Sequence, residues 1–121
     1  MIIKPLRYNK VWGSEHWICN TEQYCGKLLY MDDKSEISLH FHAIKDEVFF
    51  CLEGDVMLTI VTKNGERERI RLAPGQPAYR ILPCTPHSIK ALSKSTIIEF
   101  SSHHEDSDSY RLSHSIAGIK E

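Results

Sequence analysis

Residues 39–54 read LHFHAIKDEVFFCLEG and combine two strand-like runs with side chains of the kind that bind metals. His40 and His42 are one residue apart, and because side chains alternate along a strand, both imidazoles face the same side, about 7 Å apart. We expect Ile37 and Leu39 on the opposite face. Imidazoles that point into a small closed barrel are costly to bury unless something binds them.

A metal ion needs ligands from more than one strand, because a single strand cannot surround it. Glu47 follows the turn at residues 43–46, and we expect its strand to be the antiparallel neighbour that brings it beside His42. His87 follows PCTP at residues 83–86, a loop made rigid by two prolines, on a strand expected across the barrel. Any one of these histidines alone would more often be a surface or hydrogen-bonded core residue.

Three neutral imidazoles and one carboxylate form a site for one divalent metal ion, with Zn, Fe(II), Mn, Ni and Co as the candidates. Such a donor set leaves one or two coordination positions open for water or substrate. An open position is typical of a catalytic metal site and not of a structural one.

From about residue 25 onward, short β-forming runs alternate with turn signals. The expected strands lie at 24–31, 35–42, 47–54, 55–62, 66–73, 77–82, 87–92 and 95–101. Asn64-Gly65 between two of these runs predicts a tight hairpin. No window has helical periodicity with caps, although the tail at 111–121 either forms a short helix or stays disordered. Eight or nine short strands joined by tight turns predict an all-β sandwich or barrel.

A chain of 121 residues predicts a single domain over 1–121, because one core rarely divides below about 150 residues. We expect a barrel core at about 24–101, an N-terminal strand segment at 8–20 and a polar tail at 102–121.

The formal net charge of -1 excludes bulk electrostatic attraction to nucleic acid or anionic lipid. Charged residues at positions 4, 7 and 10 break the apolar start, so no signal peptide is predicted, and no run of about 18 apolar residues predicts a membrane helix. A cytoplasmic protein is therefore expected. The cysteines form no CxxC pair and are predicted to be buried reduced thiols at positions 19, 25, 51 and 84.

The order of these residues resembles the cupin superfamily. LHFHAIKDEVFFCLEG resembles its first motif, and PCTPHSI at residues 83–89 resembles its second. The glycine that heads the first motif in the family is replaced here by Asp33 or Lys34, whereas Gly75 precedes the second motif. The resemblance spans about residues 24–101 and implies an antiparallel jelly-roll β-barrel. It implies that the metal is held by His40, His42, Glu47 and His87.

Flanking segments are similar, in the same order, to the cupin module of mannose-6-phosphate isomerases and related sugar-phosphate cupins. These segments are KVWGSE at 10–15, GKLL at 26–29, SLH at 38–40, KDE at 45–47 and IIEFS at 97–101. The similarity implies isomerase or epimerase chemistry on a sugar or sugar phosphate as the small-molecule partner. Those enzymes usually have glutamine where His40 stands here.

Aldose–ketose isomerisation needs a Lewis acid and a base that moves a proton between neighbouring carbons. Glu99 and Lys27 are the candidate catalytic residues, on strands expected to be neighbours, although Lys27 could equally be an exposed strand charge. The polar segment at 101–111 reads more simply as a solvated exit from the barrel. Alternatively, Arg111 and Tyr110 fold over the cavity mouth and bind substrate, with the guanidinium gripping a phosphate.

Trp12 and Trp17 are expected on an outer face or a dimer contact. Cys51 is expected near the cavity as core filler. His103 and His104 are adjacent, so their side chains point opposite ways on a strand.

Two other functions stay open from the sequence. A site of three histidines and one glutamate also suits an Fe(II) dioxygenase. The same metal could instead hold a ligand in a non-catalytic sugar-binding or regulatory protein. A homodimer is expected in each case, because small β-sandwiches often bury an edge strand or an apolar outer face against a second copy.

Overall fold

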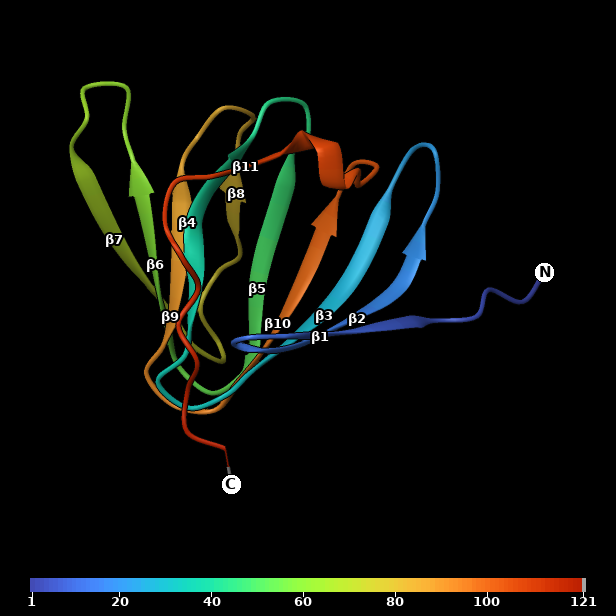
Figure 1. Ribbon diagram of the computed structural model, residues 1–121, viewed down its shortest axis with the longest axis horizontal. Coiled ribbons are helices and arrows are strands. Elements are labelled where there is room, and N and C mark those ends of the chain that lie inside the picture. The colour runs from blue at the N-terminus through green and yellow to red at the C-terminus, as the bar shows by residue number, and fades with distance from the viewer. Residues whose placement is uncertain (121) are drawn as a thin grey trace.

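The computed structural model describes residues 1–120, which form two antiparallel sheets closed against each other as a jelly-roll barrel (Figure 1). The strands are β1 (Leu6–Lys10), β2 (Gly13–Asn20), β3 (Cys25–Met31), β4 (Glu36–His42), β5 (Glu47–Glu53), β6 (Val56–Val61), β7 (Arg67–Leu72), β8 (Tyr79–Ile81), β9 (His87–Ala91), β10 (Ser95–Ser101) and β11 (Ser109–Arg111). One short 3-10 helix, η1 (Asp106–Asp108), precedes β11. The predicted all-β antiparallel jelly-roll barrel is confirmed.

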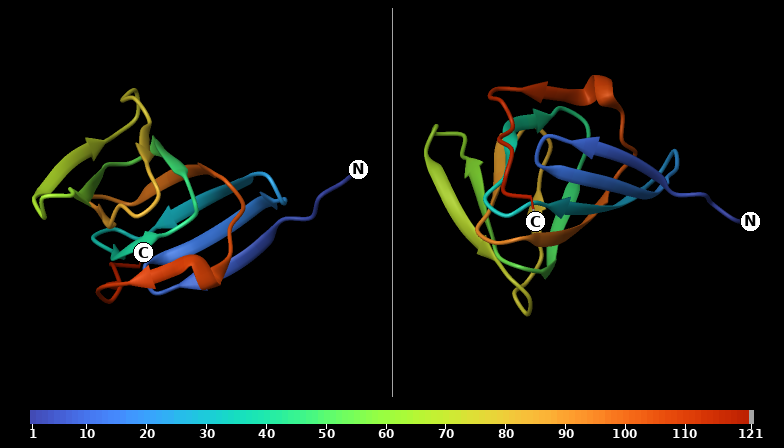
Figure 2. Two further views of the ribbon diagram at one scale, coloured as in Figure 1. Left: turned by 90° about the horizontal axis from the view of Figure 1, so that it is seen from above. Right: turned by 60° about the horizontal axis from the view of Figure 1, so that its bottom comes forward.

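Each sheet draws its strands from distant parts of the chain. The six-stranded sheet has the order β1-β2-β3-β10-β5-β8, and the five-stranded sheet has the order β11-β4-β9-β6-β7. Strands of both sheets surround the interior in the right-hand view of Figure 2. Alternation along the strands fills this interior, so that in β3 every second residue from Cys25 to Met31 is buried. One half of the barrel holds an apolar core that includes Val56, Leu58 and Ile97.

The two most local predictions about strands had different outcomes. The Asn64-Gly65 hairpin is confirmed, because β6 and β7 pair directly across it and Gly65 has a φ of 79°. The N-terminal segment expected at 8–20 forms strands, and it is divided into β1 and β2, which pair as a hairpin that turns at Val11-Trp12. This hairpin extends the six-stranded sheet at its edge.

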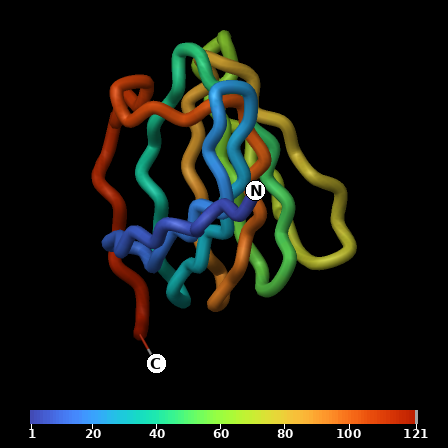
Figure 3. Tube along the Cα trace, turned by 90° about the vertical axis from the view of Figure 1, so that its right-hand side faces the viewer, coloured from blue at the N-terminus to red at the C-terminus, as the bar shows by residue number. Residues whose placement is uncertain are grey.

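The C-terminal tail is neither a helix nor disordered over the residues that the structure describes. After β11 it runs extended beside β4, where the Leu112 N–H donates to the Leu39 carbonyl over 2.7 Å. Further bridges join Ile116 to Glu36 and Ile119 to Asp33. The tail lies against this edge of the barrel in Figure 3. The prediction failed because the tail takes its partners from residues 73 to 86 positions earlier in the chain, which no local pattern records.

Strand β4 contains an irregularity that changes which residues face inward. Its pairing with β9 shifts register between Ile37 and His40. Such a bulge breaks the simple alternation of faces. Ile37 therefore lines the same cavity as His40 and His42, and the prediction that it would face away from them is wrong.

The cysteines are all free thiols, as predicted, but only half of them are buried. Cys25 and Cys51 lie in the interior, whereas Cys19 is partly exposed and Cys84 is exposed. Cys84 sits on the loop before β9 with a φ of 65°, so its side chain projects from a turn and not from a strand. Within residues 1–120 there is no helix with the length and apolar character needed to cross a membrane.

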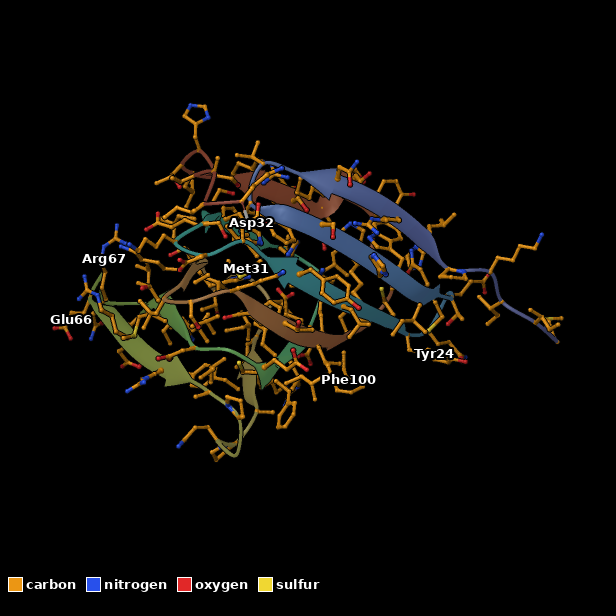
Figure 4. All side chains as sticks on the ribbon, turned by 90° about the horizontal axis from the view of Figure 1, so that it is seen from below. Tyr24, Met31, Asp32, Glu66, Arg67 and Phe100 are labelled. Carbon is orange, nitrogen blue, oxygen red and sulfur yellow. The ribbon has the colours of Figure 1, made fainter. Side chains whose placement is uncertain are left out.

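Several large apolar side chains lie on the outer surface. Tyr24 is 55% exposed and projects from the turn before β3. Phe100 is 57% exposed and projects from β10 in the six-stranded sheet (Figure 4). Apolar surface of this kind suits contact with a second copy. The homodimer stays a prediction.

Gly54 links β5 to β6, and a substitution there tests the close packing of this turn against residues 94 and 95. Its φ of +92° is strained for any other residue, and a Cβ there would collide with the Lys94 carbonyl oxygen and the Ser95 side chain. We expect Gly54→Ala to lower the free energy of unfolding by more than about 2 kcal/mol, measured by urea denaturation. Gly65→Ala is the control, because its φ is also positive at +79° but nothing lies within 4 Å. Equal losses for the two variants would contradict the close approach at Gly54.

Candidate metal centre

Three imidazoles meet inside the barrel at one end of the five-stranded sheet. His40 and His42 come from β4 and His87 from β9, and one ring nitrogen of each lies within 4.8 Å of the others. His40 and His87 are direct partners across the β4–β9 pair, with ring centroids 4.4 Å apart. The expectation that His87 would lie across the barrel is therefore wrong, because its strand is the neighbour of β4.

Glu47 approaches the imidazoles from the opposite sheet. Its Oε2 lies 3.2 Å from His87 Nε2 and 3.4 Å from His42 Nε2. Strand β5 belongs to the six-stranded sheet, so the expectation that it would pair with β4 is also wrong. Residues 43–46 carry the chain from one sheet to the other. The four side chains thus converge as predicted, but by a different path of the chain.

Hydrogen bonds fix the orientation of all three rings. The Nδ1 atoms of His40, His42 and His87 lie 2.7, 3.1 and 2.8 Å from backbone carbonyl oxygens. A carbonyl oxygen only accepts, so each Nδ1 carries the proton and donates it. The Nε2 atoms are left available for a metal ion, and those of His42 and His87 lie beside Glu47. Backbone carbonyls hold metal-binding histidines in this way in many proteins.

Burial keeps the imidazoles of His40 and His42 neutral. It lowers the pKa of His40 to about 3, with a further contribution from His87. It lowers the pKa of His42 to about 3 as well, with a further contribution from the Lys45 ammonium. Neutral imidazole is the form that binds a metal ion.

The four groups fit a cation. Glu47 Oε2 and His87 Nε2 are buried and have no hydrogen-bond partner among residues 1–120. His87 Nε2 and Glu47 Oε2 lie 3.2 Å apart, and a cation placed between them would bond to both. Nitrogen and oxygen donors together suit one divalent ion of the Zn, Fe, Mn, Ni and Co group.

An inner cavity of about 80 Å³ extends from this group toward the surface. Both sheets line the cavity, and its lining includes Trp12, Lys27, Lys45, Glu99, His104 and Arg111. We use the term inner cavity for this space together with the four metal-binding side chains.

Buried charges continue inward from the metal-binding group. Lys45 Nζ lies 3.6 Å from Glu47 Oε1 and 3.1 Å from Glu99 Oε2, and all three side chains are at most 5% exposed. Lys27 is the direct cross-strand partner of Glu99, and its Nζ lies 4.0 Å from Glu99 Oε2. Lys27 also lies 3.5 Å from Glu15 Oε1. The inner cavity therefore contains an alternating series of carboxylates and ammonium groups.

These neighbours hold the buried pair in its charged form. Burial alone would raise the pKa of Glu99, but the Lys45 and Lys27 ammonium groups lower it to about 2. Burial alone would lower the pKa of Lys45, but Glu99 and Glu47 raise it above its ordinary value. Both groups are ionised at neutral pH.

The structure brings Lys27 and Glu99 into the inner cavity, and it separates Arg111 from Tyr110. Strand β11 pairs with β4 so that Arg111 lies opposite His40 and Tyr110 lies opposite Phe41. Arg111 therefore lines the inner cavity. Tyr110 faces away and stacks on Phe41 with ring centroids 5.0 Å apart, so its predicted place at the cavity mouth is wrong. Successive residues of a strand point to opposite faces, so Arg111 and Tyr110 cannot both line the inner cavity.

Both tryptophans were assigned wrongly to an outer contact. Trp12 is 4% exposed, belongs to the apolar core and lines the inner cavity. The Trp17 ring lies under Lys27 Nζ, 4.2 Å from the ring centroid, where it stabilises the buried ammonium. Cys51 packs in the apolar core as expected. It is not one of the described residues that line the inner cavity.

Several residues that shape the site were not among the predicted site residues. Lys45 belongs to the turn expected at residues 43–46, and it is buried because this turn crosses between the sheets. Asp108 holds that turn, since its carboxylate accepts the backbone N–H groups of residues 43–45. His104 lines the inner cavity with Nδ1 3.1 Å from Lys45 Nζ, whereas His103 contacts the Thr21 carbonyl outside it. Only the acidic run at 105–108 hinted at such a role.

Comparison with known proteins identifies the fold. No family model matches the sequence, and no curated protein matches it significantly. Oxalate decarboxylase from Bacillus subtilis, in its structure at pH 4.6, superimposes with a TM-score of 0.78 and 16% identity, over 89% of this chain and 30% of that chain. Another structure of that enzyme, from work on its Mn(II) centres, gives a TM-score of 0.77, 16% identity and the same 89% and 30% coverage. The chain thus spans about 30% of the length of these structures and shares their fold.

Removal of one imidazole tests the metal centre. We expect wild-type protein to hold one divalent ion per chain and His87→Ala to lose most of it, measured by elemental analysis after dialysis. His103→Ala is the control, because that imidazole lies outside the group. Unchanged metal content in His87→Ala would contradict the assignment.

The protonation of the imidazoles predicts acid sensitivity in the metal-free protein. His40 and His42 have a pKa of about 3 in the folded chain, against about 6.5 when unfolded. Between these values the unfolded chain binds more protons, so the free energy of unfolding falls as pH drops from about 6.5 toward about 3. We expect urea denaturation to give this decline and His40→Gln to make its slope shallower. If the free energy of unfolding falls with pH at the same slope in the wild type and in His40→Gln, that result would argue against buried neutral imidazoles.

Proposed function

We propose that this protein is a metal-dependent enzyme of the aldose–ketose isomerase or epimerase type, acting on a small sugar or sugar phosphate. The observation that carries the proposal is the buried, ionised Glu99–Lys45 pair beside the metal-binding group in one cavity. Isomerisation of this kind moves a proton between neighbouring carbons next to a polarised carbonyl. The cavity holds the residue types that this reaction needs.

The metal would be held by His40, His42, Glu47 and His87. When bound, a divalent ion supplies Lewis acidity toward a carbonyl and its neighbouring hydroxyl. The remaining steps belong to the side chains of the chain itself. A cytoplasmic location and a homodimer remain part of the proposal.

Glu99 is the proposed base. Its carboxylate is ionised at neutral pH, so it can accept a proton from one substrate carbon and return it to the neighbouring carbon. A carboxylate with a pKa of about 2 is a weak base while Lys45 donates to it. A substrate oxygen that takes the Lys45 hydrogen bond releases Glu99 and makes the carboxylate more basic.

Lys45 and Lys27 have different proposed roles. Lys45 lies between Glu47 and Glu99, so its ammonium can donate to the substrate oxygen that gains negative charge. Lys27 lies between Glu15 and Glu99 and over the Trp17 ring, where it positions the base. Lys27 is thus a positioning residue in this proposal and not a proton donor.

A second candidate follows from the size of the inner cavity. A volume of about 80 Å³ suits a small carboxylic acid, and oxalate decarboxylase is the name of the enzyme whose fold this chain shares. Arg111 offers a guanidinium for such an acid. Turnover of oxalate and related small acids, with oxygen uptake monitored, separates this candidate and an Fe(II) dioxygenase from the isomerase.

Glu99→Gln tests the proposal directly. We expect this variant to lower kcat for the best substrate in a panel of sugars and sugar phosphates by at least about 100-fold, the usual contribution of a general base. Its metal content should be unchanged, since Glu99 is not among the metal-binding groups.

Glu68→Gln is the matched control, because that carboxylate is exposed on β7. A kcat of Glu99→Gln equal to that of the wild type would contradict the assignment of Glu99 as the base. Tight sugar binding without turnover by the wild-type protein would instead favour the non-catalytic binding function.

A further inference from the structure

A second hollow lies on the outer face of the six-stranded sheet, and we call it the outer-face groove. It measures about 400 Å³ and is formed by β1, β2 and the end of β3, with residues of the β9–β10 turn and the C-terminal tail at its sides. Glu15 of β2 lines the inner cavity, whereas its neighbours Ser14 and His16 point the opposite way and line the groove. The two spaces have no lining residue in common among residues 1–120, so the groove is a separate candidate site.

Strand pairing fixes the floor of the groove. Asn9, Ser14 and Tyr30 are direct partners across β1, β2 and β3. In a neighbouring row, Arg7 lies opposite His16. Polar side chains are thus held at fixed spacing by three hydrogen-bonded strands, and a binding site built on strands is more precise than one built on loops.

Bases outnumber acids in the groove. Its lining contains Arg7, Lys94 and Lys120 but only one carboxylate, that of Asp32. Arg7 and Lys94 form no ion pair with a carboxylate among residues 1–120. The groove therefore attracts an anion, and the guanidinium of Arg7 can bind two oxygens of a carboxylate or phosphate group at once.

Two polar atoms of the groove residues lack a partner. His16 Nε2 and Asp32 Oδ2 are buried, and neither has a hydrogen-bond partner among residues 1–120. Asp32 directly follows β3 and is labelled in Figure 4. An ionised carboxylate only accepts hydrogen bonds, so a bound molecule that satisfies Asp32 has to bring a hydroxyl or amino donor.

We infer that the outer-face groove binds a small organic anion that also carries hydroxyl or amino groups. Arg7 and Lys94 hold its oxyanion, and Asp32 accepts a hydrogen bond from its hydroxyl or amino group. Both parts of the ligand are needed, because an oxyanion alone would meet Asp32 with like charge and a neutral polyol would leave the two bases without a counter-charge. This site is independent of the metal centre and of the proposed isomerase activity.

Three probes of similar size separate these requirements. Glycerate carries a carboxylate and two hydroxyls, propionate carries only the carboxylate, and glycerol carries only hydroxyls. We expect glycerate to shift the backbone amide NMR signals of residues 14 and 16 in a saturable way in the zinc-loaded full chain. It should bind at least about tenfold more tightly than propionate or glycerol, as one charge-assisted hydrogen bond implies.

Glycerol 3-phosphate distinguishes the two kinds of oxyanion. Saturable binding of either glycerate or glycerol 3-phosphate at residues 14 and 16 supports the groove, and the tighter of the two identifies the preferred group. Failure of both to shift these signals would overturn the inference without bearing on the proposed isomerase.

Substitutions assign the binding to named residues. Arg7→Gln should weaken glycerate binding by at least about tenfold. Asp32→Asn should reduce the preference for glycerate over propionate, since a neutral amide accepts a weaker hydrogen bond than a carboxylate does. Arg67→Gln is the matched control, because that guanidinium lies at the tip of the β6–β7 hairpin (Figure 4).

His87→Ala separates the groove from the metal centre. It should bind glycerate as the wild type does, because that imidazole belongs to the inner cavity. Glycerate binding that survives Arg7→Gln but is lost in His87→Ala would mean that the metal holds the ligand, and this result would overturn the inference. Binding that depends on Arg7, in a protein that isomerises no sugar, would support the groove and refute only the proposed isomerase.

Discussion

The arrangement of the site depends on one constraint, which is the meeting of buried imidazole nitrogens and a buried carboxylate from the two facing sheets. His87 Nε2 and Glu47 Oε2 lie 3.2 Å apart, and neither has a hydrogen-bond partner among the described residues. A cation placed between these two atoms would bond to both of them. The barrel creates this situation because β4 and β9 belong to one sheet and β5 to the other. Two facing sheets can surround an ion where a single strand cannot.

The same constraint organises the charges around the site. Lys45 neutralises Glu47 and Glu99 together, and Lys27 continues the alternation to Glu15. Burying ion pairs is costly, and an apolar core of the same volume is often at least as stable. Stability alone therefore does not explain the series. The Asp108 carboxylate accepts a hydrogen bond from the backbone N–H of Lys45, in the turn that crosses between the sheets, and so keeps Lys45 in this position.

The sequence predicted the parts of the site that depend on short-range spacing. His40 and His42 share a face because they are two residues apart on a strand, and Asn64-Gly65 forms its hairpin for equally local reasons. Which strands are neighbours depends on long-range pairing, so the positions of β5 and β9 were exchanged in the prediction.

The burial of Lys45 was missed for the same kind of reason. It follows from where a turn crosses the barrel and not from the turn's composition. The tail strand β11 was missed because its partner β4 lies far earlier in the chain. Local patterns thus predicted residue types and faces, whereas the register and the sheet order required the folded structure.

The central claim is that one metal ion joins the two sheets at this point. Anomalous X-ray diffraction at the absorption edge of the metal that copurifies with the protein tests it most directly. The account predicts a single peak about 2.0–2.2 Å from Nε2 of each of the three imidazoles and from the Glu47 carboxylate. No peak there, or a peak held by other side chains, would contradict it.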